Sequence, residues 1–501
     1  MIAIILYLII VLGIGVWFSR RNKTADDFYL GGRKLGPFVT AMSAEASDMS
    51  SYLLMGVPGL AFLTGLADAS WTAIGLIIGT YLNWLIVAKK LRHYSNRIGA
   101  VTVPAFFSER FKDKTRTLSI IAALVIIIFF VPYTASGFSA CGKLFNSLFG
   151  ADYHMAMLIC AGVIILYTML GGFMAASTSD FLQSVIMSIA LIIVLVYGVV
   201  NAGGIGNVIE NAKALPGYLS LSNTFVPETA TSEPYGWFRA CSMLAWGLGY
   251  FGMPHILLRF MAIEDANKLK LSRRVASIWC LISLGVAVFI GIVGMALVSN
   301  GVMAPLADSE RVLIEISKLL SQHGVFAALV AGVILAGILA ATMSTADSQL
   351  LAASSSVSQN IVKEKLFPNL SEETTMIIAR FTLVVIAIIA AIIAWDENSS
   401  VFGIVSFAWA GFGAAFGPVM LASLFWKRTT KWGALAGMIA GGAMVFIWKY
   451  GIATLGGYFA IYELLPAFIV GLIAIVVVSL LTKAPEKEII DDFEAVAAIK
   501  D

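Results

Sequence analysis

The polar stretch SAEASDMSSY, at positions 43–52, interrupts a long apolar segment that runs from position 37 to position 64. An apolar segment of this length crosses a bilayer as a helix, so the polar stretch lies near the middle of the membrane. A carboxylate at that depth costs about 2.5 to 3.5 kcal/mol, and ionisable residues there are functional by default. Asp48 is therefore the first candidate for a functional residue.

The whole chain is too apolar for a soluble protein. Of its 501 residues, 59% are hydrophobic, against roughly 45 to 50% in soluble domains, and its mean hydropathy is +0.90. Apolar runs of about 20 residues, the length that spans a bilayer, recur along nearly all of it. They predict an all-α polytopic membrane protein with thirteen transmembrane helices over the following residues: 2–19, 37–64, 69–88, 117–143, 154–174, 180–201, 236–257, 275–299, 324–349, 374–395, 402–426, 432–452 and 461–482.

The connections between these segments set the orientation. Most of the 33 lysine and arginine residues fall in alternate connections, which the positive-inside rule assigns to the cytoplasm, so we expect the N-terminus outside and the C-terminus inside. The first segment lacks a basic start and is expected to be an uncleaved anchor. We expect an irregular loop over 201–235, a short surface helix from Pro104 within 101–117, and a mobile tail after Lys483.

A second interrupted segment carries WGLGYFGMP at positions 246–254, with three glycines and a proline. A helix break inside lipid is tolerated only where it is buried in protein or lines a cavity. The two interrupted segments are the second and the seventh, five apart. Paired interruptions of this kind indicate the binding site of an inverted-repeat transporter.

We therefore expect a single transmembrane transporter domain over 1–501, with a five-plus-five inverted-repeat core and discontinuous helices. Its expected parts are an N-terminal extra helix and loop (1–36), a first repeat (37–201), an inverted second repeat (236–426), two C-terminal helices (427–482) and a cytoplasmic tail (483–501).

The ninth segment contains a polar cluster, LAATMSTADSQ at positions 339–349. The Ala341 carbonyl shares a helix face with the Ser344 and Thr345 hydroxyls, which follow three and four residues later. Carbonyls freed by a break near Ala46 and Met49 would add two more oxygens. The alternative is that the hydroxyls only bond to their own helix. The predicted sodium site comprises Ala46, Met49, Asp48, Ala341, Ser344 and Thr345.

Aromatic and charged residues supply further candidates. Tyr133, Trp246 and Tyr250 lie beside small residues and could hold an organic solute against their ring faces, or they pack ordinary helices. Asp180 follows Ser-Thr-Ser at a predicted cytoplasmic edge, where a helix cap is the simpler interpretation. Arg33, within GGRKLG at positions 31–36, is either functional or an anchor at the inner surface.

Enzymatic chemistry has little support in the sequence. It contains no G-x-x-x-x-G-K-[ST] phosphate loop, no nucleophile elbow and no metal-ligand spacing among its four histidines and four cysteines. The cysteines fall in apolar segments and are expected to be free thiols. We therefore expect no enzyme, and an ion gradient is the remaining source of energy.

Longer motifs are spread along nearly the whole chain. They are YLGGR at 29–33, ASDMS at 46–50, LLMG at 53–56, GGF at 171–173, WGLGYFG at 246–252 with Pro254 and His255, MST at 343–345, and WAGFGAAFGP at 409–418. With these motifs the sequence resembles the sodium/solute symporter family, and specifically its sodium/proline symporters.

The resemblance implies a thirteen-span protein with sodium at the predicted site and an essential Asp48 carboxylate. It implies roles in coupling for Arg33 and Asp180. The residues implied for proline are Ser50, Tyr52, Tyr133, Trp246, Tyr250 and Pro254.

The sequence departs from these symporters at two places. Ser51 and Tyr52 stand where the symporters usually have Gly-Trp, which could alter the substrate pocket or an outer gate. Glu45 stands where glycine is frequent, and it either faces a wet inner cavity or brings proton sensitivity to the coupling ion.

The function implied by the resemblance is secondary active symport, in which inward sodium movement drives uptake of L-proline by alternating access. Sodium is then the coupling ion, and proline and the lipid bilayer are the other partners, with no nucleic acid and no obligate protein partner. The location implied is the plasma membrane, as a multi-pass protein of a bacterial inner membrane. Another small solute (a betaine-like osmolyte, another amino acid or a carboxylate) is the main alternative, and a sodium channel or a transporter-derived sensor is a further one.

Overall fold

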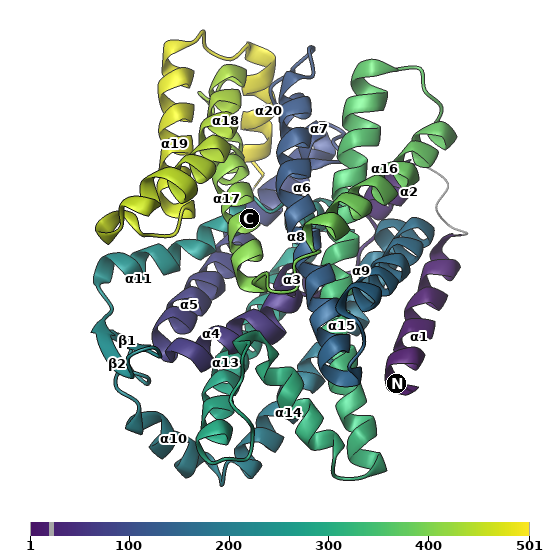
Figure 1. Ribbon diagram of the computed structural model, residues 1–501. Coiled ribbons are helices and arrows are strands. Elements are labelled where there is room, and N and C mark those ends of the chain that lie inside the picture. The colour runs from purple at the N-terminus through teal and green to yellow at the C-terminus, as the bar shows by residue number, and fades with distance from the viewer. Residues whose placement is uncertain (1, 20–24, 500–501) are drawn as a thin grey trace.

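The computed structural model describes residues 2–19 and 25–499 and is almost entirely helical (Figure 1). Helices satisfy their own backbone hydrogen bonds, which lipid cannot do, so apolar sequence of this length folds this way. The α-helices are α1 (Ile2–Ser19), α2 (Ala25–Leu30), α3 (Pro37–Ser51), α4 (Val57–Thr64), α5 (Leu66–Leu82), α6 (Ala88–Arg97), α7 (Val103–Arg110), α8 (Thr117–Phe149), α9 (Tyr153–Asn201), α10 (Ile205–Ala214), α11 (Trp237–Leu244), α12 (Pro254–Ala262), α13 (Leu269–Ser299), α14 (Val312–Ser321), α15 (Val325–Ser355), α16 (Glu372–Ile393), α17 (Val401–Phe425), α18 (Lys431–Ile447), α19 (Leu464–Leu481) and α20 (Lys487–Ala497).

Within the described residues, ten helices are long and apolar enough to cross a membrane, or eleven if α11 and α12 form one bent span. One of the ten, α9, is 49 residues long and contains Gly172 in a left-handed conformation (φ 62°), so it covers two of the expected segments. The expected segment 37–64 is split between α3 and α4 and is not among the ten. The number thirteen therefore stays a prediction.

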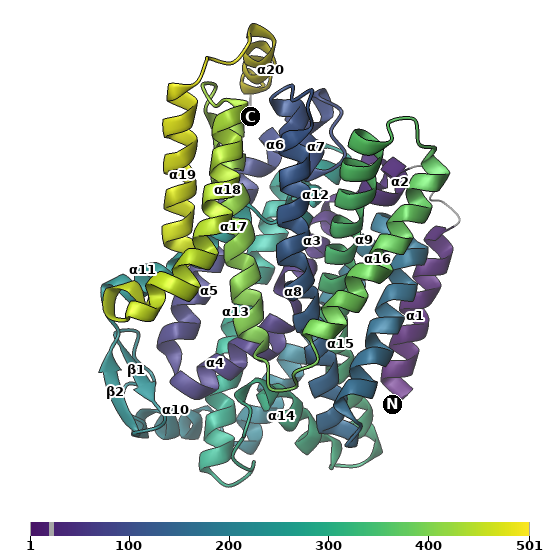
Figure 2. The same cartoon turned by 45° about the horizontal axis from the view of Figure 1, so that its top comes forward.

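Helices α3, α8, α9 and α15 pack together at the centre, and α15 is buried on every side from position 334 to position 355. Helices α18 and α19 pack against each other at one edge of the molecule, and α1 lies at the opposite edge (Figure 1). Helix α1 begins at the end of the bundle where α14 lies, and α20 lies at the other end, beside α7 (Figure 2). We call these the α14 end and the α7 end.

The first predicted break is present. Helix α3 stops where Ser50 adopts φ 51° and ψ −166°, and a π-helical turn, η2 (Tyr52–Gly56), leads into α4. A positive φ is unfavourable for a residue with a side chain, and such strain is found mainly at functional sites. The hydroxyl of Ser50 accepts a hydrogen bond from the Tyr52 amide at 3.1 Å, which helps to hold the turn.

The second predicted break is also present. After α11 the chain forms a 3₁₀ stretch, η4 (Ala245–Phe251), and then bends by 45° into α12, which begins at Pro254. Proline suits this first helical position because it has no amide to leave unpaired. Gly79 and Gly247 let η4 approach α5 at backbone distance, since a Cβ on Gly79 would lie 2.3 Å from the Gly247 carbonyl oxygen.

Three expectations about the connections were wrong. Residues 201–235 contain helix α10 and a hairpin of β1 (Asn223–Val226) and β2 (Thr231–Pro234), and Tyr218 fixes this connection to α4 by donating to the Ala61 and Phe62 carbonyls. The tail after Lys483 forms α20, which ion pairs dock at the α7 end. The fifth and sixth predicted segments are joined by continuous helix around Asp180, with the kink earlier, at Gly172. The short helix expected near Pro104 is confirmed as α7.

Candidate functional site

Helix α15 is joined to the first break by the predicted cluster of oxygens. The Ser344 hydroxyl lies 2.9 Å from the Ala46 carbonyl oxygen of α3 and 3.1 Å from the Ala341 carbonyl oxygen of its own helix. The Thr345 hydroxyl lies 3.2 Å from the same Ala341 oxygen. The hydroxyls thus do bond to their own helix, but Ser344 also reaches across to α3. This all-oxygen set suits a hard monovalent cation.

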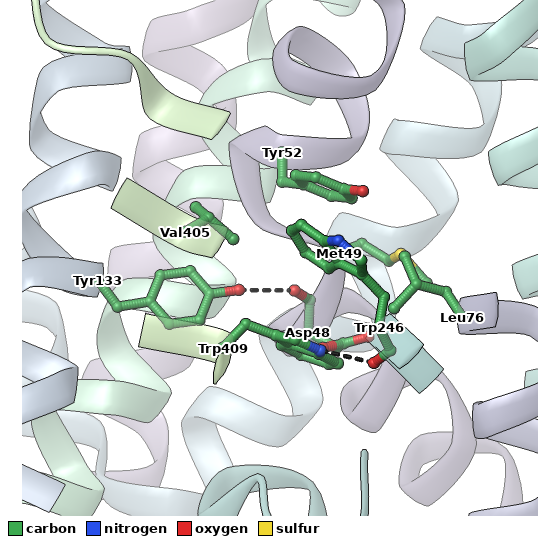
Figure 3. Close-up of a pocket in the computed structure, with 8 residues that line it drawn as sticks. All are labelled: Asp48, Met49, Tyr52, Leu76, Tyr133, Trp246, Val405 and Trp409. Carbon is green, nitrogen blue, oxygen red and sulfur yellow. Dashed lines mark hydrogen bonds between the residues drawn. The ribbon is translucent and has the colours of Figure 1, made fainter. Parts of the chain in front are cut away.

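The Asp48 carboxylate faces away from that cluster. Its Oδ2 accepts a hydrogen bond from the Tyr250 hydroxyl at 2.6 Å, and its backbone carbonyl accepts one from the Tyr133 hydroxyl at 3.1 Å (Figure 3). Residues two apart on a helix point in nearly opposite directions, so Ala46 and Asp48 serve different faces of α3. Among the described residues, no hydrogen bond joins this carboxylate to Ser344 or Thr345.

A small cavity of about 10 Å³, room for roughly one water molecule, lies beside Asp48, at the break (Figure 3). Its lining is mostly aromatic and apolar, which is typical of sites for small organic molecules, but the cavity must widen to hold one. The residues that line it are Asp48, Met49, Tyr52, Leu76, Tyr133, Trp246, Val405 and Trp409.

Stacked rings close this cavity toward the α14 end. The Tyr52 ring stacks on Trp246 with centroids 5.4 Å apart and on Phe402 at 5.6 Å. Trp246 also stacks on Tyr462 at 4.9 Å. Phe402 and Gly56 line a much larger vestibule, of about 990 Å³, on the other side of these rings. The aromatic layer therefore separates the cavity from the vestibule.

The structure brings most of the predicted substrate residues together. Tyr52, Tyr133 and Trp246 line the cavity, and Tyr250 adjoins it through Asp48. Ser50 is buried in the break but is not part of the lining. Pro254 lies elsewhere, in a separate small cavity with Pro104 and other residues nearer the α7 end.

Asp180 is not a helix cap, contrary to the simpler expectation. It is fully buried in the middle of α9, where its Oδ2 accepts hydrogen bonds from the Ser43 hydroxyl at 2.6 Å and from Arg259 Nη2 at 3.0 Å. Arg259 also donates to Ser43 at 3.0 Å and to Ser348 at 2.6 Å. These contacts join α3, α9, α12 and α15 between the cavity and the α7 end.

The Arg33 side chain binds backbone carbonyls of two other segments. It donates to the Met261 carbonyl at 2.8 Å and to the Ala100 carbonyl at 2.6 Å, and it also contacts Ser95. It thereby fixes the segment before α3 to the ends of α6 and α12, which gives it a role beyond that of an anchor at the membrane surface.

Sequence reasoning missed Arg259, because it follows the end of the predicted segment 236–257 and so falls in a basic connection. The structure places it inside α12 with 1% of its side chain exposed. Its position five residues after Pro254, in the second half of an interrupted segment, was the available signal.

A second missed group is the ion pair of Lys143 with Glu310 at 3.0 Å, beside the vestibule. Glu310 also accepts hydrogen bonds from the Ser400 hydroxyl and from the Val401 and Phe402 amides, so it caps the first turn of α17. Lys143 at the end of an apolar segment was the signal in the sequence. Trp409 was missed as well, and it donates to the Trp246 carbonyl at 2.8 Å (Figure 3).

Comparisons with known proteins agree with this geometry. Residues 28–441 match the Sodium:solute symporter family. A high-affinity proline transporter of Bacillus subtilis (strain 168) is 42% identical over 96% of this chain and 98% of that protein. The sodium/proline symporter of Escherichia coli (strain K12) is 43% identical over 95% of this chain and 91% of that protein.

A solved Na⁺-coupled sialic acid symporter, in a substrate-bound outward-open state, superposes with a TM-score of 0.80 at 20% identity, covering 97% of this chain and 98% of that one. This likeness confirms the predicted helical transporter fold. The matching family consists of transporters, in agreement with the expectation that the chain is not an enzyme. The chain belongs to the sodium:solute symporter family.

Proposed function

We propose that this chain is a secondary active symporter that couples inward sodium movement to uptake of L-proline by alternating access. The observation that carries the proposal is that one broken helix takes part in two candidate sites. One face of α3 shares an oxygen cluster with α15, and its break opens onto an aromatic cavity. The similarity to proline transporters supports proline as the solute.

We place the N-terminus outside and the C-terminus inside, so that the vestibule opens to the exterior and α20 lies in the cytoplasm. The start of α1 and helix α20 lie at opposite ends of the bundle (Figure 2), as an odd number of crossings requires. The described basic residues of α6, α7 and the start of α13 lie at the α7 end, which the positive-inside rule assigns to the cytoplasm.

Sodium would bind to the carbonyl oxygens of Ala46, Met49 and Ala341 and to the hydroxyls of Ser344 and Thr345. A cation there draws α3 and α15 together and fixes the strained backbone at Ser50. The Asp48 carboxylate acts from the opposite face, where it orients Tyr250 and adds negative charge near the ion.

The cavity would then widen to admit proline, with its ring against Tyr52, Trp246 and Trp409. Its carboxylate would find the free backbone amides at the interrupted helices, which carry partial positive charge. Tyr133 would stabilise the break, on the side that faces the solute, by donating a hydrogen bond to the Asp48 carbonyl. Phe402 would close the cavity toward the outside, and separation of Arg259 from Asp180 would open it toward the cytoplasm. Ser50 and Pro254 shape the two breaks, and Arg33 and Asp180 couple them to the inner side.

The driving force is adequate without any chemical step. One charge crossing ~100 mV supplies about 2.3 kcal/mol, and a tenfold sodium gradient adds about 1.4 kcal/mol. Together they would sustain several-hundredfold accumulation of proline at one sodium per proline.

Uptake of labelled proline into proteoliposomes with an imposed sodium gradient tests the proposal. We expect uptake that stops when sodium is replaced by potassium. Asp48→Asn should abolish it, whereas Glu210→Gln, on the exposed surface of α10, should leave it unchanged. Uptake driven equally by a proton gradient without sodium would disprove sodium coupling, and uptake of a betaine or another amino acid in place of proline would identify a different solute.

A further inference from the structure

We propose that Tyr7 of α1 is a positioning residue for sodium binding, because its hydroxyl fixes α15 to α9 directly behind the oxygen cluster. This inference rests on the proposed sodium coupling and deepens it. Helix α1 lies outside the expected five-plus-five core, and it packs against α9 and α15 at the edge of the molecule (Figures 1 and 2). Its role would therefore extend beyond anchoring the chain in the membrane.

One side of α1 is buried against these two helices. The buried residues are Ile4, Tyr7, Val11 and Gly15, spaced three or four apart, which is the pattern of a single helix face. The rest of the helix surface includes exposed isoleucine and leucine side chains, which suit contact with lipid. Of the four buried residues, Tyr7 alone carries a polar side-chain group into the interface.

The Tyr7 hydroxyl makes two hydrogen bonds. It accepts one from Gln183 Nε2 of α9 at 2.8 Å and donates one to Met343 Sδ of α15 at 3.6 Å. The longer distance fits sulfur, which is a larger and weaker acceptor than oxygen. Gln183 and Met343 are 0% and 1% exposed, and a buried donor that loses its acceptor is costly. The hydroxyl thus holds three helices in one arrangement.

Met343 lies behind the oxygen cluster. Successive helical residues point about 100° apart, so Met343 and Ser344 serve different sides of α15. Ser344 faces α3, where its hydroxyl lies 2.9 Å from the Ala46 carbonyl oxygen, whereas Met343 faces α1. Gly332 lets α1 approach α15 closely, since a Cβ there would lie 3.1 Å from the Cβ of Ala3. A shift of Met343 therefore moves the oxygens on the other side of the same helical turn.

Gln183 connects the same hydroxyl to the inner barrier. It follows Asp180 by three residues, so the two side chains share one face of α9, and Asp180 binds Arg259 at 3.0 Å. Tyr7 therefore fixes the α15 part of the sodium site to the helix that carries Asp180. Helices α9 and α15 then act as one body when Arg259 separates from Asp180.

Tyr7→Phe tests this role, because it keeps the ring and removes only the hydroxyl. Sodium binds to the arrangement in which α15 meets α3, and a smaller population of that arrangement lowers the apparent affinity in proportion. We expect the Kd of the purified protein for ²²Na⁺ to rise about three- to tenfold, the size expected for one buried hydrogen bond. The maximal rate of proline uptake at saturating sodium should stay within about twofold, as for a change in binding alone.

Met343→Leu tests the contact from the other side. Leucine has a similar volume and lacks the sulfur acceptor, so the sodium Kd should rise about twofold. Tyr7→Phe should then have a smaller effect in the Met343→Leu background than in the wild type, since the two changes break one contact. An equal effect in both backgrounds would overturn the inference. Should Tyr7→Phe fail to fold, an unchanged Kd in Met343→Leu would overturn it as well.

Tyr153→Phe is the matched control. Tyr153 is buried at the start of α9, and its hydroxyl donates to the Ala394 carbonyl at 2.8 Å. Its loss should leave the sodium Kd unchanged, and an equal rise in this variant would overturn the inference by showing a general effect of lost stability. A wild-type Kd in Tyr7→Phe would also overturn it, even if proline uptake is sodium-driven. Sodium binding without proline uptake would keep the inference and refute only the solute, whereas a wild type that binds no sodium would refute both proposals.

Discussion

The two sides of the cavity are closed in different ways. Toward the vestibule the barrier is a layer of rings, Phe402 on Tyr52 on Trp246, joined by contact alone. Toward the α7 end the barrier is a buried polar network around Arg259 and Asp180 that joins four helices. Stacked rings can slide apart at small cost, whereas a buried ion pair must be separated as a unit. The structure therefore stands closer to opening at the vestibule than at the α7 end.

The strongest test of this difference is Arg259→Gln. Removing one partner of a buried ion pair costs about 3 to 5 kcal/mol, because the other charge is left uncompensated. We expect sodium-driven uptake to fall at least a hundredfold. Cysteines introduced between the cavity and the α7 end should be labelled more strongly from the cytoplasmic side. Arg259→Lys keeps the charge and loses the forked hydrogen bonds, so its uptake should lie between that of the wild type and that of Arg259→Gln. Unchanged labelling in Arg259→Gln would show that this network does not close the inner side.

Glu310→Gln tests the vestibule side. Hydrogen bonds to a charged group contribute about 1.5 to 3 kcal/mol, and Glu310 makes such contacts with the first turn of α17 and with Lys143. The amide should hold α17 less firmly over the cavity, so we expect uptake to fall about tenfold while sodium binding persists. Accessibility of a cysteine at position 402 from outside should rise. If it falls instead, Glu310 keeps the vestibule open and the assignment is reversed.

A smaller effect is expected from the ring layer itself. Each aromatic pair contributes about 0.5 to 1.5 kcal/mol beyond its buried area, and Phe402 makes two such contacts, with Tyr52 and Trp246. Phe402→Ala should weaken the apparent affinity for proline about two- to tenfold through faster escape to the vestibule. Phe402→Tyr, which keeps the stacking, is the control. An equal effect of both changes would mean that stacking does not retain the solute.

The sequence predicted both helix breaks, because Gly, Pro and polar residues in an apolar segment act locally. It also predicted that Ala341 and Ser344 share a helix face, since this follows from their spacing, and the expected contact with Ala46 of α3 is present. It did not reveal the direction of Asp48: the spacing from Ala46 places the two residues on nearly opposite faces of α3, but only the contact with Tyr250 of η4 shows what the carboxylate faces. Asp180 and Arg259 were misplaced for a related reason. Each resembles a residue at a membrane edge, and only their contact with one another, across separate helices, explains their burial.

The docking of α20 at the α7 end should show the smallest effects. Arg97 and Lys112 bind Asp492 there at 2.8 and 3.2 Å, but their side chains are 47% and 32% exposed. Exposed ion pairs contribute roughly 0.2 to 1 kcal/mol and are screened by salt. We expect Asp492→Asn to lower uptake less than fivefold. We also expect 1 M salt to raise the hydrogen-exchange rate of α20 by less than fivefold.

The pH dependence of this docking has a definite sign. Partial burial acts to raise the pKa of Asp492, but hydrogen bonds from Arg97 and Lys112 outweigh it and hold that pKa below its ordinary value. A carboxylate of this kind contributes its full stabilisation above the unfolded pKa of about 3.9 and loses it as the pH falls through the lower, folded pKa. Between pH 5 and pH 9 Asp492 stays ionised, so its contribution to the protection of α20 against hydrogen exchange should be constant, and Asp492→Asn should remove the loss of protection seen on acidification below about pH 4. A transition in the hydrogen exchange of α20 near neutral pH that survives in Asp492→Asn would show that groups other than Asp492 hold α20 at the α7 end.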